Sequence, residues 1–265
     1  MGKVLIAAAV FNGRSHAIKE YLAALSKLKG KFDVLLVDHS GKKTYAEWLS
    51  SQTIFKIKVM HQDFPSSSDI LARRFACHTI IRDYALEKKY DSLLLLEQDV
   101  ILPEDALEKL IAAKKEVIGG VSYSVFLFGK ELVKMPKVYG FYTEEDQRTL
   151  IADKENLRRI NPKLFEALDQ NKWDFTDVKR PLSVEDVQGN GVLAIKSSSF
   201  DCLLISRKTL AKVPFAGTDG VSDDVRFFID LKKESIACYV HKDVQCLRRV
   251  PQELLEQAKT LAGAQ

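Results

Sequence analysis

Apolar runs alternate with helix-like segments over the first 124 residues of the chain. The runs are apolar at nearly every position, which is typical of strands covered on both faces. Between them, apolar residues recur at three- and four-residue spacing, which predicts amphipathic helices. Strands are expected at 4–10, 32–37, 54–60, 92–96 and 117–123, and helices at 17–28, 44–49, from 66–69 to about 88, and from 103 to about 115. This alternation predicts an α/β fold with a mostly parallel, doubly wound sheet and helices on both faces.

The pattern becomes irregular from about residue 126 to 190, where three prolines interrupt it. We expect an excursion over the sheet there, with a helical part at 153–171, rather than a separate domain. Beyond it the pattern predicts strands at 192–195, 202–205, 236–240 and 244–247, and helices from Ser206, at 223–233 and at 253–261. We therefore expect one domain over 1–265, made of a first half (1–124), a second half (125–250) and a C-terminal helix (251–265).

Composition narrows the class of protein. A chain of 265 residues with 46% hydrophobic residues can bury a full core, which excludes disorder as its main state. The four cysteines (Cys77, Cys202, Cys238 and Cys246) form no CxxC pair, so neither a disulfide framework nor a zinc finger is expected. The longest apolar run is too short to span a bilayer and lacks the flanks of a signal peptide. We expect a cytoplasmic protein without a transmembrane segment.

The net charge of +4 is too small for a dedicated nucleic-acid binder, so no nucleic-acid partner is expected. It suits an anionic ligand and is compatible with peripheral contact with an anionic membrane surface. Neither a glycine-rich dinucleotide-binding turn nor a P-loop motif is present, which excludes those two nucleotide-binding classes.

Polar residues follow three of the predicted strands, at Asn12, Asp38 and Asp99. Open α/β sheets bind ligands at the carboxyl ends of their strands. Glu97 and Asp99 are alternate residues, which share a face in an extended chain and can converge on one Mn²⁺ or Mg²⁺ ion. From these residues alone, a helix cap and a solvated acid remain an equal alternative.

The motifs, in order, resemble those of GT-A glycosyltransferases, family 2 and its relatives in particular. Glu97-Gln98-Asp99 resembles the DXD motif, with Glu in the first place, and Ser222-Asp223-Asp224 resembles the acceptor-side "xEDxxF" motif. Four more segments are similar to family motifs. Segment 4–12 resembles the opening strand and Asn turn, and segment 34–40 resembles the "VVDDGS" strand end. Segment 117–123 resembles the strand after DXD, and segment 200–207 resembles "GxCLLIRR". The resemblance covers nearly the whole chain except about 126–186.

The resemblance implies metal-dependent transfer of a sugar from a nucleoside-diphosphate sugar to a glycan, lipid-linked or protein acceptor that the sequence does not name. Inversion is the expected stereochemistry, and retention stays open. Residues 1–124 would bind the donor and 125–250 the acceptor. Mn²⁺ or Mg²⁺ would compensate the charge on the leaving diphosphate. Asp99 and Glu97 would be its ligands, with His241 as a candidate third ligand. Asp224 would be the catalytic base and Asp223 its support, before a helix whose N-terminus favours a carboxylate. The donor would contact Ala9, Phe11, Asn12, Asp38, Arg74, Glu97, Gln98 and Arg248.

The chain departs from the family pattern at several positions. Many relatives have a late histidine as the third metal ligand, and Arg248 stands at that position. A guanidinium cannot ligate a cation but can hold a diphosphate. His39 replaces the second Asp of "VDD". Two alternatives stay open: a non-catalytic sugar-nucleotide or glycan-binding protein of the same fold, which Arg248 favours, and a nucleotidyltransferase. The latter would need a glycine-rich basic loop after the first strand, where only Gly13-Arg14 is present.

Overall fold

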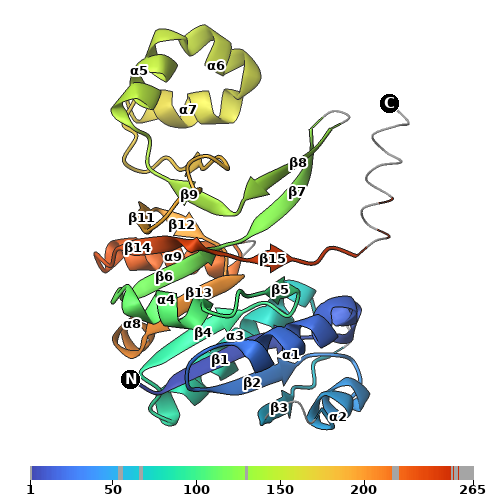
Figure 1. Cartoon of the computed structure of the whole chain (residues 1–265). Coiled ribbons are helices and arrows are strands. Elements are labelled where there is room, and N and C mark those ends of the chain that lie inside the picture. The colour runs from blue at the N-terminus through green and yellow to red at the C-terminus, as the bar shows by residue number, and fades with distance from the viewer. Residues whose placement is uncertain are drawn as a thin grey trace.

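The computed structural model describes residues 2–52, 56–65, 68–128, 131–216, 221–251, 253 and 256. Its centre is an eight-stranded sheet with the strand order β11-β14-β6-β13-β4-β1-β2-β3 (Figure 1). The strands are β1 (Val4–Val10), β2 (Phe32–Asp38), β3 (Ile57–His61), β4 (Ser92–Leu96), β6 (Val117–Val121), β11 (Val192–Ile195), β13 (Cys202–Ser206) and β14 (Cys238–Gln245). Strands β1 to β4 pair in parallel, as do β6 and β14, whereas β13 runs antiparallel to β4 and β6, and β11 to β14. The predicted mostly parallel α/β sheet is confirmed.

Helices cover both faces of this sheet. They are α1 (Ile18–Lys27), α2 (Thr44–Ser50), α3 (Ile70–Glu87), α4 (Ala106–Ala112), α8 (Arg207–Lys212) and α9 (Asp223–Lys233). Alternate residues of β1 enter two separate cores: Leu5 and Ala7 lie with residues of α3, α8 and α9, and Val4 and Ile6 with residues of α1, α2 and α4. This two-sided burial explains why β1 is apolar throughout.

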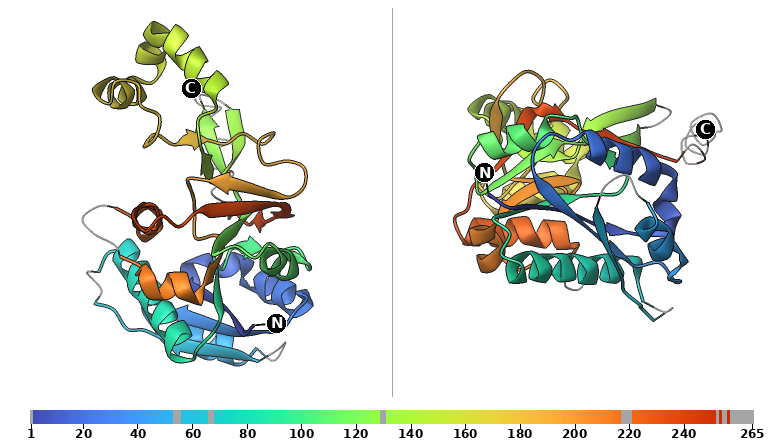
Figure 2. Two further views of the ribbon diagram at one scale, coloured as in Figure 1. Left: turned by 90° about the vertical axis from the view of Figure 1, so that its left-hand side faces the viewer. Right: turned by 60° about the horizontal axis from the view of Figure 1, so that its bottom comes forward.

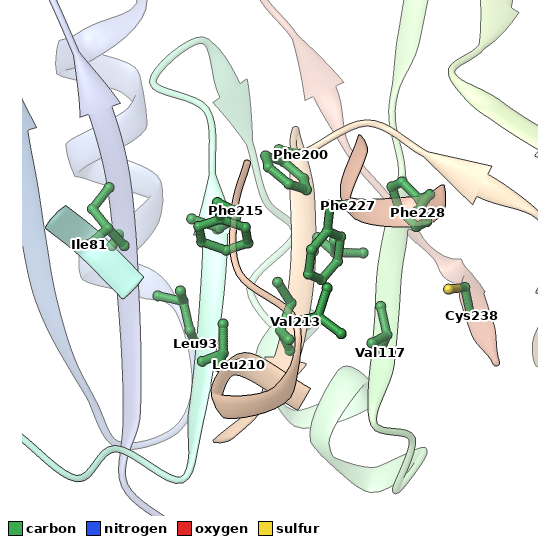
Figure 3. Packing of buried hydrophobic residues seen from close by; sticks show 14 of the residues in the cluster. Ile81, Leu93, Val117, Phe200, Leu210, Val213, Phe215, Phe227, Phe228 and Cys238 are labelled. Carbon is green, nitrogen blue, oxygen red and sulfur yellow. The ribbon is translucent and has the colours of Figure 1, made fainter. Parts of the chain in front are cut away.

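The first of these cores is rich in phenylalanine near β13. Figure 3 shows Phe200, Phe215 and Phe227 gathered against one another, with ring centroids 5.2–5.4 Å apart. Aromatic rings at these distances pack edge-to-face or tilted, which stabilises the core beyond simple burial. Because Phe200 directly precedes Asp201 and Phe227 lies on α9, this packing fixes two segments that carry acidic site residues.

Smaller elements surround the sheet. They are a 3-10 turn, η1 (Asn12–Ala17), two ribbons, β5 (Val100–Ile101) with β15 (Leu247–Arg248) and β7 (Tyr123–Phe128) with β8 (Glu131–Pro136), and a three-stranded sheet of β10 (Arg180–Pro181), β9 (Val138–Gly140) and β12 (Ser197–Ser198). Three helices, α5 (Glu144–Ala152), α6 (Lys154–Ile160) and α7 (Pro162–Gln170), complete the irregular part of the chain.

These three helices differ from the expected excursion over the sheet. They lie beyond the β11 end of the sheet rather than on its face, as the two views in Figures 1 and 2 agree. They have a small core of their own around Leu157, Leu168 and Phe175. A capping box at Thr143 and Asp146 starts the first of them, earlier than the predicted helix at 153–171.

Two further boundaries differ from the sequence prediction. The helix expected from residue 17 begins as the 3-10 turn η1. The two strands expected at 236–240 and 244–247 form one strand, β14, with a register shift between His241 and Gln245. The expected C-terminal helix falls largely outside the described residues.

Each of the four cysteines is buried and free. Within the described ranges, no helix is long and apolar enough to cross a bilayer.

Candidate functional site

The carboxyl end of β4 forms the centre of the candidate site. Glu97, Gln98 and Asp99 are almost fully buried. The Gln98 side chain accepts a hydrogen bond from the Phe11 backbone N–H (2.6 Å) and donates one to the Phe11 carbonyl (3.1 Å). Gln98 therefore joins the ends of β4 and β1, while Glu97 and Asp99 are left to face other groups.

Three arginines from distant parts of the chain surround these two carboxylates. Arg14 of η1 lies 2.8 Å from Glu97 Oε2 and 3.7 Å from Asp99 Oδ2. Arg248 of β15 lies 3.2 Å from the same Asp99 oxygen, and Arg74 of α3 lies 3.9 Å from Glu97 Oε1. Burial raises the pKa of Asp99, although Arg248 and Arg14 oppose this effect. The acids at the DXD-like motif are thus paired with cationic side chains.

The β5–β15 ribbon places Arg248. In its register Arg248 lies opposite Val100, and the backbone N–H of Arg249 donates to the Asp99 carbonyl at 2.8 Å. The Arg248 guanidinium then bridges Asp99 and Asp201, with 2.7 Å to Asp201 Oδ2. Arg248 stands where many family members have a metal-ligating histidine. Its guanidinium is therefore held at this position by two carboxylates.

Asp201 is a site residue to which the sequence analysis gave no role. It is 3% exposed and also accepts hydrogen bonds from Lys137 (2.9 Å) and Ser122 (2.8 Å). Burial opposes its ionisation, but Lys137 and Arg248 outweigh this and lower the pKa of Asp201 to about 2. Its only sequence signal was a charged residue beside an apolar strand. We assign it the role of anchoring Arg248.

The start of α9 faces α3. Asp223 is 4% exposed, pairs with Arg74 (2.9 Å) and is hydrogen-bonded to His78 Nδ1. Burial opposes its ionisation, but His78 and Arg74 lower the pKa of Asp223 to about 2. Since Arg74 lies near both Glu97 and Asp223, the DXD-like motif and the acceptor-side motif lie close together.

Asp224 is half-buried next to this pair. Its Oδ1 accepts hydrogen bonds from the Ser222 hydroxyl and the Val225 backbone N–H. Within the described residues, no hydrogen bond to its Oδ2 is present. Lys179 lies close enough to Asp224 for their charges to interact. Burial lowers the pKa of Lys179, and the negative charge of Asp224 opposes this shift. Lys179 lies in the segment without family resemblance, so the sequence analysis did not identify it.

The ends of β1 and β2 form a second group of expected residues. The Phe11 ring stacks on His39, with centroids 5.1 Å apart. Burial lowers the pKa of His39 to about 4, so this ring is neutral at pH 7. Ser40 joins the two strand ends because its hydroxyl accepts from the Asn12 backbone N–H (2.9 Å) and donates to Asp38 Oδ1 (2.6 Å). Ala9 is a buried strand residue in the core.

Asp38 is fully buried, and both of its oxygens have partners. Oδ1 accepts from Ser40, and Oδ2 lies 2.7 Å from His61 Nδ1. Burial disfavours the charged imidazole of His61, but its hydrogen bonds to Asp38 and Asp63 outweigh this and raise its pKa. In this arrangement Asp38 orders the strand end, and contact with a nucleotide base stays a prediction that requires one of these partners to move.

A divalent cation does not fit the residues in this arrangement. The expected ligands Asp99, Glu97 and His241 do not form a site: among the described residues, no three His, Cys, Asp or Glu side chains are grouped to hold a metal ion. His241 lies on β14 and faces Asp243 at 3.3 Å. One buried oxygen, Asp99 Oδ1, has no hydrogen-bond partner in the described part of the chain. A cation bound there would have Arg248 and Arg14 beside it.

No family model matches the sequence, and no curated protein matches it either. Solved structures do match. TarS from S. aureus is 13% identical, over 100% of this chain and 39% of that chain, with a TM-score of 0.51. A mannosyltransferase from Pyrobaculum calidifontis, PcManGT, in complex with GDP-Man and Mn²⁺, is 13% identical, over 95% of this chain and 58% of that chain, with a TM-score of 0.51. GalNAc-T7 with UDP, GalNAc and Mn²⁺ is 7% identical, over 94% of this chain and 44% of that chain, with a TM-score of 0.52.

These similarities establish the fold. The chain has the GT-A fold of glycosyltransferases, as the motif order predicted, and spans about two fifths to three fifths of the length of these three proteins. At this level of identity the likeness concerns architecture. The chemistry has to be argued from the side chains of this chain.

Proposed function

We propose that the protein transfers a sugar from a nucleoside-diphosphate sugar to an acceptor hydroxyl, with inversion at the anomeric carbon. One observation carries the proposal: Arg74 lies near Glu97 at the end of β4 and pairs with Asp223 at the start of α9. A carboxylate, Asp224, is thereby positioned beside the sheet edge at which α/β folds bind nucleotides.

In the proposed reaction the acceptor oxygen forms a bond to the anomeric carbon of the donor. The bond from that carbon to the diphosphate oxygen breaks, and its electron pair stays on the diphosphate. The hydroxyl proton passes to Asp224 Oδ2, the oxygen without a hydrogen bond in the described residues, and then to solvent. Asp223 holds Arg74 and the start of α9 in place. Phe11, which stacks on neutral His39, offers an aromatic surface for the nucleotide base.

The resemblance also implied Mn²⁺ or Mg²⁺, and Mn²⁺ is present in the PcManGT and GalNAc-T7 structures. Because the described residues of this site do not fit a divalent cation, no step of the proposed reaction uses one. In this chain such a cation would have to displace Arg248 from Asp99 Oδ2 or bind through Oδ1 alone.

The experiment is a panel of UDP-, GDP-, CDP- and dTDP-sugars, each with and without Mn²⁺, followed by release of the nucleoside diphosphate. Binding of one donor, with its hydrolysis or transfer, supports the proposal. Binding without any turnover supports the non-catalytic alternative. A parallel panel of nucleoside triphosphates with sugar phosphates tests the nucleotidyltransferase, which release of pyrophosphate would support. Absence of binding across the panel contradicts the proposed function.

A further inference from the structure

The candidate site presents guanidinium groups, not carboxylates, towards solvent. The side chain of Arg14 is 31% exposed, that of Arg74 23% and that of Arg248 16%. The side chains of Glu97 and Asp99 are each only 6% exposed. The acids therefore lie beneath the arginines and hold them, and an incoming group meets the arginines first.

We propose that Arg248 and Arg14 compensate the charge of the donor diphosphate in place of a divalent cation, so that the donor binds without metal. This inference rests on the proposed function and specifies how its donor site works. An arriving diphosphate is attracted to these groups, whereas a divalent cation is repelled by them. Guanidinium groups also match phosphate oxygens with paired N–H donors, which a point charge does not.

The two arginines have N–H groups left for a ligand. A guanidinium carries five N–H donors. In the described residues Arg14 uses one nitrogen, Nη1, for both Glu97 and Asp99. Arg248 uses Nη1 for Asp201 and Nη2 for Asp99. The remaining donors can bind phosphate oxygens without breaking the anchoring ion pairs.

The anchors also hold Arg248 before any ligand arrives. Asp201 is fixed by Lys137 and Ser122, and Asp99 follows a strand buried in the core. An arginine held by two buried carboxylates loses little side-chain freedom on binding, which favours affinity. In the group-transfer step these N–H groups stabilise the negative charge that the broken C–O bond leaves on the diphosphate oxygen.

The first test is calorimetric titration of the full chain with UDP, GDP, CDP and dTDP, in EDTA and in Mn²⁺. We expect one nucleotide to bind equally well in both, and Arg248→Gln to weaken that binding in EDTA by roughly ten- to a hundredfold. Arg249→Gln is the matched control, because its side chain pairs with Glu20 on the surface, away from Asp99. Equal binding by Arg248→Gln and the parent in EDTA would overturn the inference.

Arg14→Gln is a second variant, which keeps the inference testable if Arg248→Gln fails to fold. Arg14 is the most exposed of the three arginines, and Glu97 keeps Arg74 as a neighbour in its absence. We expect this variant to fold, to melt at a somewhat lower temperature than the parent because Glu97 loses its 2.8 Å partner, and to lose nucleotide affinity in EDTA. If it folds and binds like the parent, the inference is wrong.

Arg248→His tests directly whether the guanidinium takes the place of a divalent cation. It puts an imidazole beside Asp99, whose Oδ1 is available, and removes the guanidinium. We expect this variant to bind nucleotide weakly in EDTA and to regain affinity with Mn²⁺. Affinity equal to that of the parent in EDTA would contradict the inference.

The parent protein separates this inference from the proposed function. Binding that requires Mn²⁺ in the parent overturns the inference and leaves the glycosyltransferase proposal intact. If the parent binds no nucleotide, neither in EDTA nor in Mn²⁺, both the inference and the proposed function are overturned.

Discussion

At the residue scale, buried carboxylates organise the site. Asp201 and Asp223 are each buried and each held by two side chains. Lys137 and Arg248 hold the first, and Arg74 and the His78 ring hold the second. Removing one partner from a buried ion pair costs several kcal/mol, because the remaining charge is left uncompensated. The ion pairs of these acids hold Arg248 and Arg74 in place.

The first prediction concerns acid stability. The pKa of Asp201 is about 2, below the ordinary value of 3.8. Its ionised form therefore contributes stability that is present above about pH 4 and is lost as the pH falls towards 2, about 2 kcal/mol in all. Urea unfolding of Asp201→Asn should show a weaker loss of stability over that range than the parent. Asp83→Asn, an exposed acid, is the control and should follow the parent. Parallel curves for Asp201→Asn and the parent would contradict the prediction.

The second prediction separates chemistry from binding at Asp224. Because a base acts on the acceptor, Asp224→Asn should lower transfer by about 10²–10⁴-fold and leave nucleotide affinity unchanged. Steady-state transfer and calorimetry measure the two. Asp230→Asn on the same helix is the control, because Asp230 pairs with Arg226 and Lys233. Loss of affinity and turnover together in Asp224→Asn would move this residue to the donor site.

The sequence identified four acids of the site and the arginines Arg74 and Arg248, but not Asp201 or the ion pairs that join these residues. Glu97 and Asp99 could be recognised because one short motif follows a buried strand, and Asp223 and Asp224 because they precede a helix. Ion pairs between residues 14, 97 and 248 depend on how distant segments pack, which local patterns do not encode. For the same reason Lys137 and Lys179, in segments without regular pattern, were not predicted.

At the element scale, the strands buried on both faces were the most predictable parts. β1 begins and ends where its apolar run does, and α9 covers the expected residues. The boundary between the two strands expected near residue 242 was wrong, because β14 continues as one strand that pairs with β6 on both sides of a register shift between His241 and Gln245. Hydrophobicity alone cannot show that a polar segment is held by its neighbours' hydrogen bonds.

The third prediction concerns the contact between β6 and β14, which leads into β15. A Cβ at Gly120 would lie 2.7 Å from Cys246 Sγ and 2.8 Å from Val244 Cγ1. Gly120→Ala should therefore push the end of β14 away and destabilise the protein by about 1–3 kcal/mol. Since β15 follows directly, nucleotide affinity through Arg248 should fall as well.

Denaturant unfolding and calorimetry check this third prediction. Gly41→Ala is the control, because a Cβ there meets no heavy atom within 4 Å. If Gly120→Ala unfolds and binds like Gly41→Ala, the close contact at β14 does not position Arg248.

At the scale of the whole molecule, the sheet and the outer helices are built differently. The sheet buries two continuous cores, whereas α5, α6 and α7 share a small core of their own. Lys196 connects the two parts by donating hydrogen bonds to the carbonyls of Phe175 and Thr176. We propose, in line with the expected division of the chain, that the sheet edge binds the donor and that the outer helices shape the acceptor side.

The last prediction tests whether the outer helices can unfold without the sheet. Leu168 is fully buried in the small core, so Leu168→Ala should cost about 2–5 kcal/mol within that core alone. Hydrogen exchange of residues 144–170 should accelerate, while β1, β2 and β4 keep their protection, because local opening needs no disruption of the sheet. Nucleotide affinity should be unchanged and transfer to an acceptor reduced. Ile160→Ala is the control, since Ile160 is 66% exposed on α6. Faster exchange throughout the sheet in Leu168→Ala would mean that the chain unfolds as one unit.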